Sequence, residues 1–429
     1  MSIEEIYKNF QLNPKISTDS RKIIPNSLFF ALKGENFNGN TFAEKAISDG
    51  AAYVIIDEAK YKINEQYILV DNVLKTLQDL AIFHRNTLNI PIIGITGTNG
   101  KTTTKELINV VLSEKYKILA TIGNLNNHIG VPLTILSITK EHEIAIIEMG
   151  ANHIGEIAEL CEIAKPDFGI ITNIGKAHLE GFGGIEGVIK TKSDLYKAIK
   201  KRKGKVFVNI NNELLMNLSA DIDNITYGNS QDAYCNGKLL AANPFVKVQY
   251  SCEEFYDEIQ TQLVGNYNFE NILAAITIGL YFNVEKASIK TAIEAYQPSN
   301  SRSQVVKTAK NTIILDAYNA NPTSLEAAIR NFSEIQAENK VLIIGDMLEL
   351  GKYSKSEHSR IIKIIEEEKF EKVLLVGTEF SEACTDHHWN CFNDSEMAKQ
   401  WLIDNPITNA YVLVKGSRGI KLEKVLDTL

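Results

Sequence analysis

Short apolar runs alternate with longer segments of helical periodicity along most of the chain. Each run predicts a buried strand, and apolar residues spaced i, i+3 and i+4 predict helices that pack on one face. Regular alternation of strands and helices is typical of an α/β fold, with a mostly parallel sheet covered by helices on both faces. The predicted strands are residues 27–32, 53–56, 90–95, 117–121, 143–147, 168–172, 312–315, 340–344, 372–376 and 410–414.

The same pattern predicts three domains, because 429 residues are too many for one ordinary core. Residues 1–85 form a small α/β unit, and residues 86–297 form a larger α/β domain. A linker-like stretch, Gln297 to Ser301, separates the latter from residues 298–429. This last part has the strand and helix pattern of a dinucleotide-binding (Rossmann-like) fold but lacks the G-x-G-x-x-G fingerprint.

A glycine-bearing turn joins the strand at 90–95 to a helix that carries Leu107 and Val111 on its apolar face. Backbone N–H groups of such a turn and the following helix N-terminus bind phosphate. Lys101 supplies a point charge for the outer phosphates, and the Thr102 hydroxyl can hold Mg²⁺. The predicted phosphate-binding residues are Gly97, Thr98, Asn99, Gly100, Lys101, Thr102 and Thr103.

The turn is shorter than the usual G-x-x-x-x-G-K-[ST], because Ile95 stands where the first glycine is expected and Gly94 comes one place early. A bare Gly-Lys-Thr could also be a helix cap. The order strand, turn and helix favours phosphate binding.

Polar residues that follow strands matter because ligands of parallel sheets collect at the carboxyl ends of the strands. Glu148 follows the strand at 143–147 and could reach Mg²⁺. His178 lies beyond the strand at 168–172, but a loop histidine is more often solvated and Mg²⁺ prefers oxygen. A polar loop at 33–42 could hydrogen-bond a sugar nucleotide, although loops of this composition are usually only connections.

Composition narrows the class of protein. Hydrophobic residues make up 44% and charged residues 23%, as in soluble globular proteins. The net charge of -8 argues against nonspecific nucleic-acid binding. The start of the chain lacks the basic and apolar regions of a signal peptide, and the longest apolar stretch, residues 272–282, is too interrupted to span a bilayer. We therefore expect a cytoplasmic monomer without membrane insertion.

Five scattered cysteines fit reduced thiols. Cys384, His387, His388 and Cys391 have the residue types of a zinc site. Adjacent histidines point apart, however, and the segment lies between a predicted helix and strand. A structural role is favoured over zinc.

Several motifs together resemble those of the Mur ligases, the ATP-dependent amide-forming enzymes of bacterial peptidoglycan synthesis. They occur in family order and cover the chain nearly end to end. Within the family, residues 126–132, 345–351 and 414–418 resemble the member that uses a dipeptide. The motifs are residues 97–102, 148–152, 172–178 and 316–322.

The resemblance implies that ATP phosphorylates the terminal carboxylate of UDP-N-acetylmuramoyl-tripeptide. The amine of D-alanyl-D-alanine then displaces phosphate through a tetrahedral intermediate. Negative charge accumulates in such a step, so the site needs cations more than a nucleophile. The catalytic residues implied are Lys101, Glu148, His178 and Lys192.

Two Mg²⁺ ions are implied by the resemblance, held by Thr102, Glu148, His178 and Lys192. Lys192 matches the family's carbamylated lysine, whose CO₂ adduct is an anion that attracts the metal. Without the family, Lys192 is one lysine in a lysine-rich helix, with Lys190 close by.

The resemblance also implies binding residues. Tyr267 takes the place of the usual histidine, so that histidine's role is not carried over. Contacts to ATP from two domains imply closure on substrate. The ATP residues are Asn268, Asn271, Arg302 and Asp316. Residues implied for the UDP-sugar are Ser20, Arg21, Lys33 and Gly34; for the muramoyl peptide, Asn126 and Asn127; for the dipeptide side, Asn319, Asn321, Lys415, Ser417 and Arg418.

Two alternatives stay open at this point. One is another amide ligase of the superfamily, either an earlier Mur step or a folylpolyglutamate synthetase. Asp404-Asn405-Pro406 is followed by Ile407, not the arginine of the diaminopimelate-adding step, which counts against that step. The other is a switch that hydrolyses ATP without joining anything.

Overall fold

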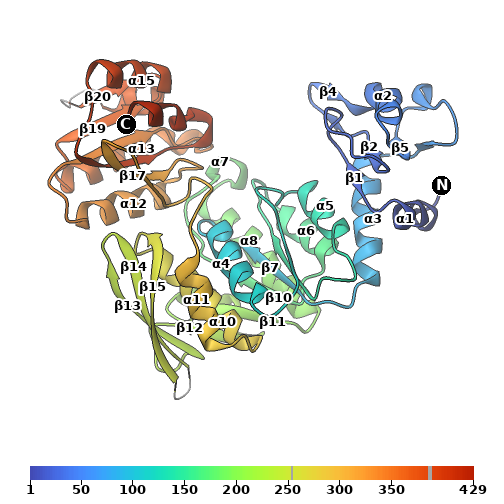
Figure 1. Cartoon of the computed structure of the whole chain (residues 1–429), viewed down its shortest axis with the longest axis horizontal. Helices are drawn as coiled ribbons and strands as arrows, with labels where there is room; N and C mark the ends of the chain where they lie inside the picture. Colours follow the sequence, from blue (N-terminus) through green and yellow to red (C-terminus); the bar gives the residue numbers. More distant parts are fainter. Residues whose placement is uncertain (253–254, 385–388) are drawn as a thin grey trace.

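The computed structural model describes residues 1–252, 255–384 and 389–429. Three domains follow one another along the chain, each with its own sheet, and the N-terminal domain stands apart from the C-terminal domain (Figure 1). The predicted α/β class is confirmed. Among the described residues, no helix combines the length and apolarity needed to cross a membrane.

The N-terminal sheet is fully parallel, in the order β1-β2-β5-β6. Its strands are β1 (Ile16–Ser17), β2 (Leu28–Phe30), β5 (Tyr53–Ile56) and β6 (Tyr67–Leu69). The hairpin of β3 (Lys33–Gly34) and β4 (Phe37–Asn38) lies within the predicted polar loop. The helices are α1 (Ile3–Leu12), α2 (Ala43–Ser48) and α3 (Val73–Thr87).

Helix α3 runs through residue 85, where the sequence predicted a domain boundary, and packs on α1 as well as on central helices. Arg85 is buried and donates to the Ala164 carbonyl at 3.0 Å and to the Asp167 carboxylate at 2.8 Å. His84 contacts the Ile138 carbonyl at 2.9 Å. These contacts anchor the N-terminal domain to the central one.

The central sheet has the order β15-β14-β13-β12-β11-β10-β7-β9-β8. Its parallel strands are β7 (Ile92–Thr96), β8 (Ile118–Ala120), β9 (Ile144–Glu148), β10 (Phe168–Ile171), β11 (Lys205–Asn209), β12 (Asp223–Gly228) and β13 (Cys235–Ala242). Two antiparallel strands extend one edge, β14 (Phe245–Cys252) and β15 (Phe255–Val264). The β13–β15 meander was not among the predicted strands, although β14 alternates partly exposed and buried residues as a strand should.

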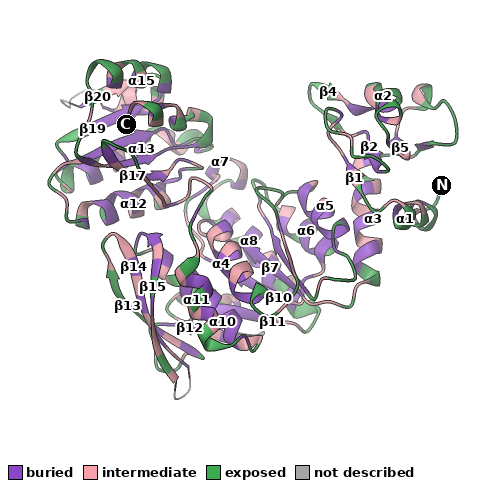
Figure 2. Cartoon of the chain, in the orientation of Figure 1, coloured by how far each residue is buried: buried purple, intermediate pink, exposed green. Residues whose placement is uncertain are grey.

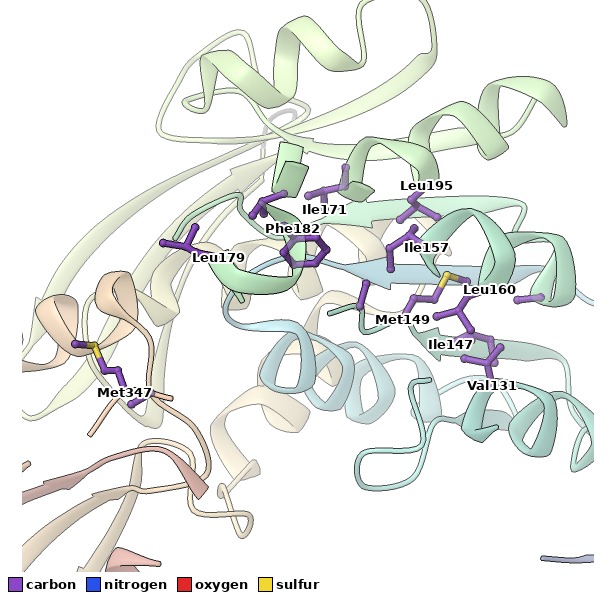
Figure 3. Close-up of a cluster of buried hydrophobic side chains, with 14 of the residues drawn as sticks. Val131, Ile147, Met149, Ile157, Leu160, Ile171, Leu179, Phe182, Leu195 and Met347 are labelled. Carbon is purple, nitrogen blue, oxygen red and sulfur yellow. The ribbon is translucent and has the colours of Figure 1, made fainter. Parts of the chain in front are cut away.

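Helices cover both faces of the central sheet, and its inner strands β7, β9, β10 and β11 are almost wholly buried (Figure 2). On one face Ile147 and Met149 pack with Leu160 and Leu195 of two helices (Figure 3). The other face packs on α4 and α10. The helices are α4 (Lys101–Ser113), α5 (Gly130–Leu136), α6 (Glu156–Ala164), α7 (Leu179–Phe182), α8 (Ile185–Lys201), α9 (Glu213–Leu218), α10 (Asn268–Tyr281) and α11 (Lys286–Ala295).

The C-terminal sheet has the order β16-β17-β21-β18-β19-β20, and only β16 is antiparallel to its neighbour. Its strands are β16 (Gln304–Lys307), β17 (Asn311–Asp316), β18 (Lys340–Gly345), β19 (Lys372–Val376), β20 (Asn390–Phe392) and β21 (Ala410–Lys415). Its helices are α12 (Pro322–Glu334), α13 (Ser354–Glu367), α14 (Thr378–Ala383) and α15 (Ser395–Asp404). This is the Rossmann-like arrangement that the sequence predicted.

Candidate active site

A cavity of about 870 Å³ lies between the central and C-terminal domains. It opens at the carboxyl ends of β7, β9 and β10, where ligands of parallel sheets bind. The predicted residues that line it from the central domain are Thr98, Asn99, Gly100, Lys101, Thr102, Thr103, Asn126, Asn127, Glu148, His178, Lys192, Asn268 and Asn271. Those from the C-terminal side are Arg302, Asp316, Asn319, Asn321, Lys415 and Arg418.

The phosphate-type loop leaves β7 through Gly97 and enters α4 through Gly100, both with positive φ. A Cβ on Gly100 would lie 2.6 Å from Oδ1 of Asn271, so only glycine lets that asparagine pack on the loop. Nζ of Lys101 donates to the carbonyls of Gly97 and Thr98, at 2.7 and 3.1 Å. The loop therefore has the strand, turn and helix order that the sequence predicted.

The pKa of Lys101 is lower than that of an exposed lysine. Withdrawal from water lowers the pKa of Lys101 to about 8, against the opposing effect of the Glu148 charge, and the Arg302 charge adds to the lowering. A dianionic phosphate at this position would favour the protonated amine.

Glu148 is the last residue of β9 and is almost completely buried. Thr102 Oγ1 donates to its Oε2 at 2.9 Å, and Asn126 Nδ2 donates to its Oε1 at 2.8 Å. Lys105 was missed by the sequence analysis: its buried Nζ lies 3.9 Å from Oε2 of Glu148 and donates to the Thr121 carbonyl at 2.7 Å. The available signal was spacing, since Lys105 is four residues after Lys101 on one helix face.

Lys192 lies in α8 with 3% of its surface exposed. Burial, reinforced by the charge of Lys101, holds the pKa of Lys192 well below its usual range. Its Nζ is 5.9 Å from the centre of the Phe182 ring. Burial therefore favours the neutral amine, which is the form that can add CO₂.

His178 precedes α7 in a left-handed conformation, with φ of 50°. Its Nδ1 lies against Oε2 of Glu349 of the C-terminal domain. This contact lowers the pKa of Glu349. The sequence did not predict Glu349 as a partner, although its segment 345–351 was among the motifs.

Asp316 is the last residue of β17. Its carboxylate accepts hydrogen bonds from Lys415 Nζ at 2.6 Å and from the Ser303 amide at 3.4 Å. The Arg302 guanidinium carbon lies 3.8 Å from the centre of the Tyr318 ring, and that of Arg418 lies 5.5 Å away. Two arginines therefore flank one aromatic ring at the C-terminal wall of the cavity.

Asn321 caps α12, with its Oδ1 accepting from the Ser324 amide at 2.9 Å and Pro322 in the first turn. Ser417 does not line the cavity. Its buried hydroxyl bonds instead with the Ala320 carbonyl and the Leu348 amide, at 3.3 and 3.0 Å.

The four residues expected to bind the UDP-sugar, Ser20, Arg21, Lys33 and Gly34, lie in the N-terminal domain and do not line the cavity. Arg21 pairs with Asp19 on the surface. Lys33 Nζ pairs with Asp57 at 2.8 Å and with Glu58 at 3.1 Å.

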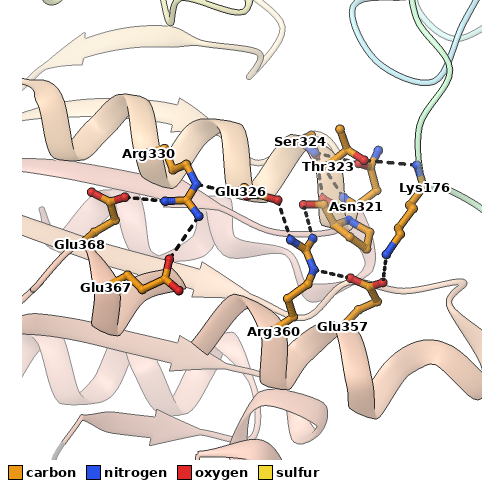
Figure 4. A network of polar contacts seen from close by, with 11 residues as sticks. Lys176, Asn321, Thr323, Ser324, Glu326, Arg330, Glu357, Arg360, Glu367 and Glu368 are labelled. Carbon is orange, nitrogen blue, oxygen red and sulfur yellow. Dashed lines mark hydrogen bonds and ion pairs between the residues drawn. The ribbon is translucent and has the colours of Figure 1, made fainter. Parts of the chain in front are cut away.

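Further contacts join the central domain to the C-terminal one (Figure 4). Lys176 Nζ lies 2.7 Å from Oε1 of Glu357, and the Lys176 amide donates to Thr323 at 3.2 Å. Arg360 holds the other oxygen of Glu357 at 2.7 Å and continues the network to Glu326. The loop at 172–178 thus contacts the phosphate-type loop on one side and the C-terminal domain on the other.

Side chains that commonly bind metals do not cluster within the described part of the chain. Within residues 1–252, 255–384 and 389–429 no group of three or more His, Cys, Asp or Glu side chains could hold a metal ion. His387 and His388 of the weighed zinc cluster lie outside the described residues, while Cys384 is a buried thiol.

Comparison with known proteins places the sequence in a family. Residues 15–85 match the Mur ligase family catalytic domain, residues 95–279 the Mur ligase middle domain, and residues 301–418 the Mur ligase glutamate ligase domain. The chain belongs to the Mur ligase family.

Individual members of the Mur ligase family match this chain over nearly its whole length. The UDP-N-acetylmuramoyl-tripeptide–D-alanyl-D-alanine ligase of Bacillus subtilis is 33% identical, covering 100% of this chain and 97% of the relative. The enzyme of that name from Escherichia coli is 31% identical, covering 96% and 93%. The crystal structure of MurF from Acinetobacter baumannii has a TM-score of 0.87 at 28% identity over 96% and 92%. MurF ligase from Thermotoga maritima, in complex with ADP, has a TM-score of 0.85 at 25% identity over 97% of both chains.

A folylpolyglutamate synthase from Thermotoga maritima has a TM-score of 0.61 at 14% identity, covering 83% of this chain and 93% of that one. At that identity the likeness extends to the fold alone. The folate alternative therefore gains no support at the level of the site.

Proposed function

We propose that this protein is an ATP-dependent ligase that joins D-alanyl-D-alanine to UDP-N-acetylmuramoyl-tripeptide, a step of peptidoglycan precursor synthesis. The arrangement of cationic and carboxylate groups around one cavity carries the proposal. Lys101, Glu148 and Lys192 face it from the central domain, and Arg302 and Asp316 face it from the C-terminal side. The full-length likeness to enzymes of that name supports the choice of substrates.

In the first step a terminal carboxylate oxygen of the tripeptide attacks the γ-phosphorus of ATP, and the bond to the ADP oxygen breaks. Several negative charges meet there, so Lys101 and Arg302 lower the barrier by offsetting them. In the second step the dipeptide amine attacks the acyl carbon. The nitrogen loses a proton, phosphate leaves, and the amide remains.

Mg²⁺ fits this cavity because the Thr102 hydroxyl and the Glu148 carboxylate meet at 2.9 Å beside the phosphate-type loop. Mg²⁺ is usually bound by one or two carboxylates together with substrate phosphates and water. We assign Thr102 and Glu148 to one ion. His178 and carbamylated Lys192 would hold a second. Bound Mg²⁺ supplies charge that neutralises the phosphate oxygens.

Carbamylation of Lys192 is supported by its depressed pKa and burial, since only a neutral amine adds CO₂. The reaction forms a C–N bond and releases one proton. It converts an amine, whose protonated form would repel Mg²⁺, into an anion that attracts the ion.

The remaining assignments divide the substrates among the predicted domains 1–85, 86–297 and 298–429. Asn268, Asn271 and Asp316 would hold the adenosine part of ATP. The UDP-sugar would lie on the N-terminal domain at Ser20, Arg21, Lys33 and Gly34, and the muramoyl peptide would pass Asn126 and Asn127 into the cavity. The dipeptide would meet Asn319, Asn321, Lys415 and Arg418. Ser417 has no direct part, because its hydroxyl is used internally.

The decisive experiment is a coupled phosphate-release assay over a panel of UDP-muramoyl peptides and amine acceptors. We expect release only when tripeptide and D-alanyl-D-alanine are both present. Release that ignores the dipeptide would identify a switch. Release with a single amino acid and a shorter acceptor, or with folate, would identify another ligase of the superfamily.

A further inference from the structure

The segment that enters α10 carries a tyrosine with an unusual set of contacts. Tyr267 is partly buried and lines the cavity beside Asn268 and Ser303. Its ring folds back over Gly265, which has φ of 99°, and a Cβ on that glycine would lie 2.4 Å from the ring. The direction of the tyrosine side chain is therefore set by the backbone beneath it.

The Tyr267 hydroxyl lies 3.0 Å from Oγ of Ser303, which follows the linker and directly precedes β16. One residue earlier, the Asn266 amide donates to Oδ1 of Asn331 in α12 at 2.9 Å. The start of α10 is thus tied to the C-terminal side at two neighbouring residues. Of these, only the Tyr267 contact reaches the residue that directly follows Arg302.

The backbone on either side of Arg302 is strained. Ser301 and Ser303 both have positive φ, 56° and 49°, a conformation that non-glycine residues adopt at an energetic cost. The Ser303 amide donates to Oδ1 of Asp316 only at 3.4 Å. The hydrogen bond to Tyr267 is the shorter of these two contacts of Ser303.

Arg302 lies between the two strained serines and lines the cavity, with its guanidinium stacked at 3.8 Å on Tyr318. Its charge acts on Lys101 across the cavity. Because Ser303 directly follows Arg302, holding Ser303 in place also holds the Cα from which the arginine reaches the cavity.

We propose that Tyr267 is a positioning residue for Arg302, acting through its hydrogen bond to Ser303. The role rests on the proposed function, because it presumes that the cavity takes the triphosphate. It requires the hydroxyl rather than the ring, so removing one oxygen atom tests it.

The test is calorimetric binding of an ATP analogue with a non-hydrolysable β–γ bond to the full chain carrying Tyr267→Phe, Ser303→Ala or both. We expect each single change to weaken binding about 2- to 10-fold, the range of one net hydrogen bond. The double change should weaken binding no further, because both changes delete one interaction. In an Arg302→Ala background, Tyr267→Phe should have no effect.

Tyr250→Phe is the matched control. Tyr250 is buried in the same domain, and its hydroxyl has no hydrogen-bond partner among the described residues. If Tyr267→Phe disturbs folding, Ser303→Ala removes the same hydrogen bond by changing its other partner.

Three results would each overturn the inference. The first is a loss of affinity in the double variant equal to the product of the two single losses. The others are unchanged affinity in both single variants, or an undiminished effect of Tyr267→Phe in the Arg302→Ala background. A wild-type chain that does not bind the analogue would overturn the proposed function as well. Normal wild-type binding with an equally tight Tyr267→Phe variant would overturn only the role of Tyr267.

Discussion

Nδ2 of Asn321 donates to Oδ1 of Asn99 at 2.7 Å, which joins the N-cap of α12 directly to the phosphate-type loop. The two residues are far apart in sequence and belong to different domains. One asparagine therefore both starts a helix of the C-terminal domain and contacts the loop proposed to hold the triphosphate.

Asn321→Ala should reduce stability and ATP binding together. Losing an N-cap costs about 1 kcal/mol of stability, and losing the contact to Asn99 should raise KM for ATP severalfold. Thermal unfolding and steady-state kinetics measure the two effects. Asp394→Ala is the control, since Asp394 caps α15 in the same domain and does not line the cavity. An equal rise in KM for both variants would refute the dual role.

Lys192→Ala should abolish ligation while the protein stays folded. Added short carboxylates should restore part of the activity, because they replace the carbamate as an anion. Lys190→Ala serves as the control, because Lys190 is exposed on the same helix. A fully active Lys192→Ala protein would remove the carbamate from the mechanism.

The activity should fall as pH rises through about 8, the lowered pKa of Lys101. Below that pH the amine is protonated and attracts phosphate; above it the amine is neutral and the attraction is lost. The pH profile of kcat/KM for ATP reports the free enzyme and is the measurement to make. A profile that stays flat to pH 10 would show that Lys101 does not control binding.

Lys176→Met should loosen the C-terminal domain on the central one. In its ion pair with Glu357 the Lys176 side chain is half exposed. We therefore expect its removal to cost at most about 1 kcal/mol of the free energy that holds the two domains together, and less at high salt. Small-angle scattering at low and high ionic strength would detect a larger radius of gyration. Lys203→Met, at a surface turn, is the control. Identical scattering profiles for wild type and Lys176→Met would show that the ion pair between Lys176 and Glu357 does not hold the two domains together.

Scattering also tests closure in the wild type. We expect a smaller radius of gyration when ATP and the tripeptide substrate are added together, because the ATP residues lie on two domains. Superimposable profiles with and without these ligands would show that the domains do not move on binding.

The sequence by itself determined the local features. Strands such as β5 and β19 and the loop that leads into Lys101 follow from residue pattern and turn chemistry within a few positions. They were predicted because their causes are neighbours in the chain. Glu148 was also predicted, since the end of a parallel strand is a general place for a ligand-binding side chain.

Only the tertiary structure decided which distant groups meet. Lys105 beside Glu148, Glu349 on His178, Tyr267 on Ser303 and the inward hydroxyl of Ser417 all depend on how separate elements pack. The physical reason is that burial, charge pairing and hydrogen-bond partners are properties of the packed chain. No local sequence pattern contains the distance between two residues that folding brings together.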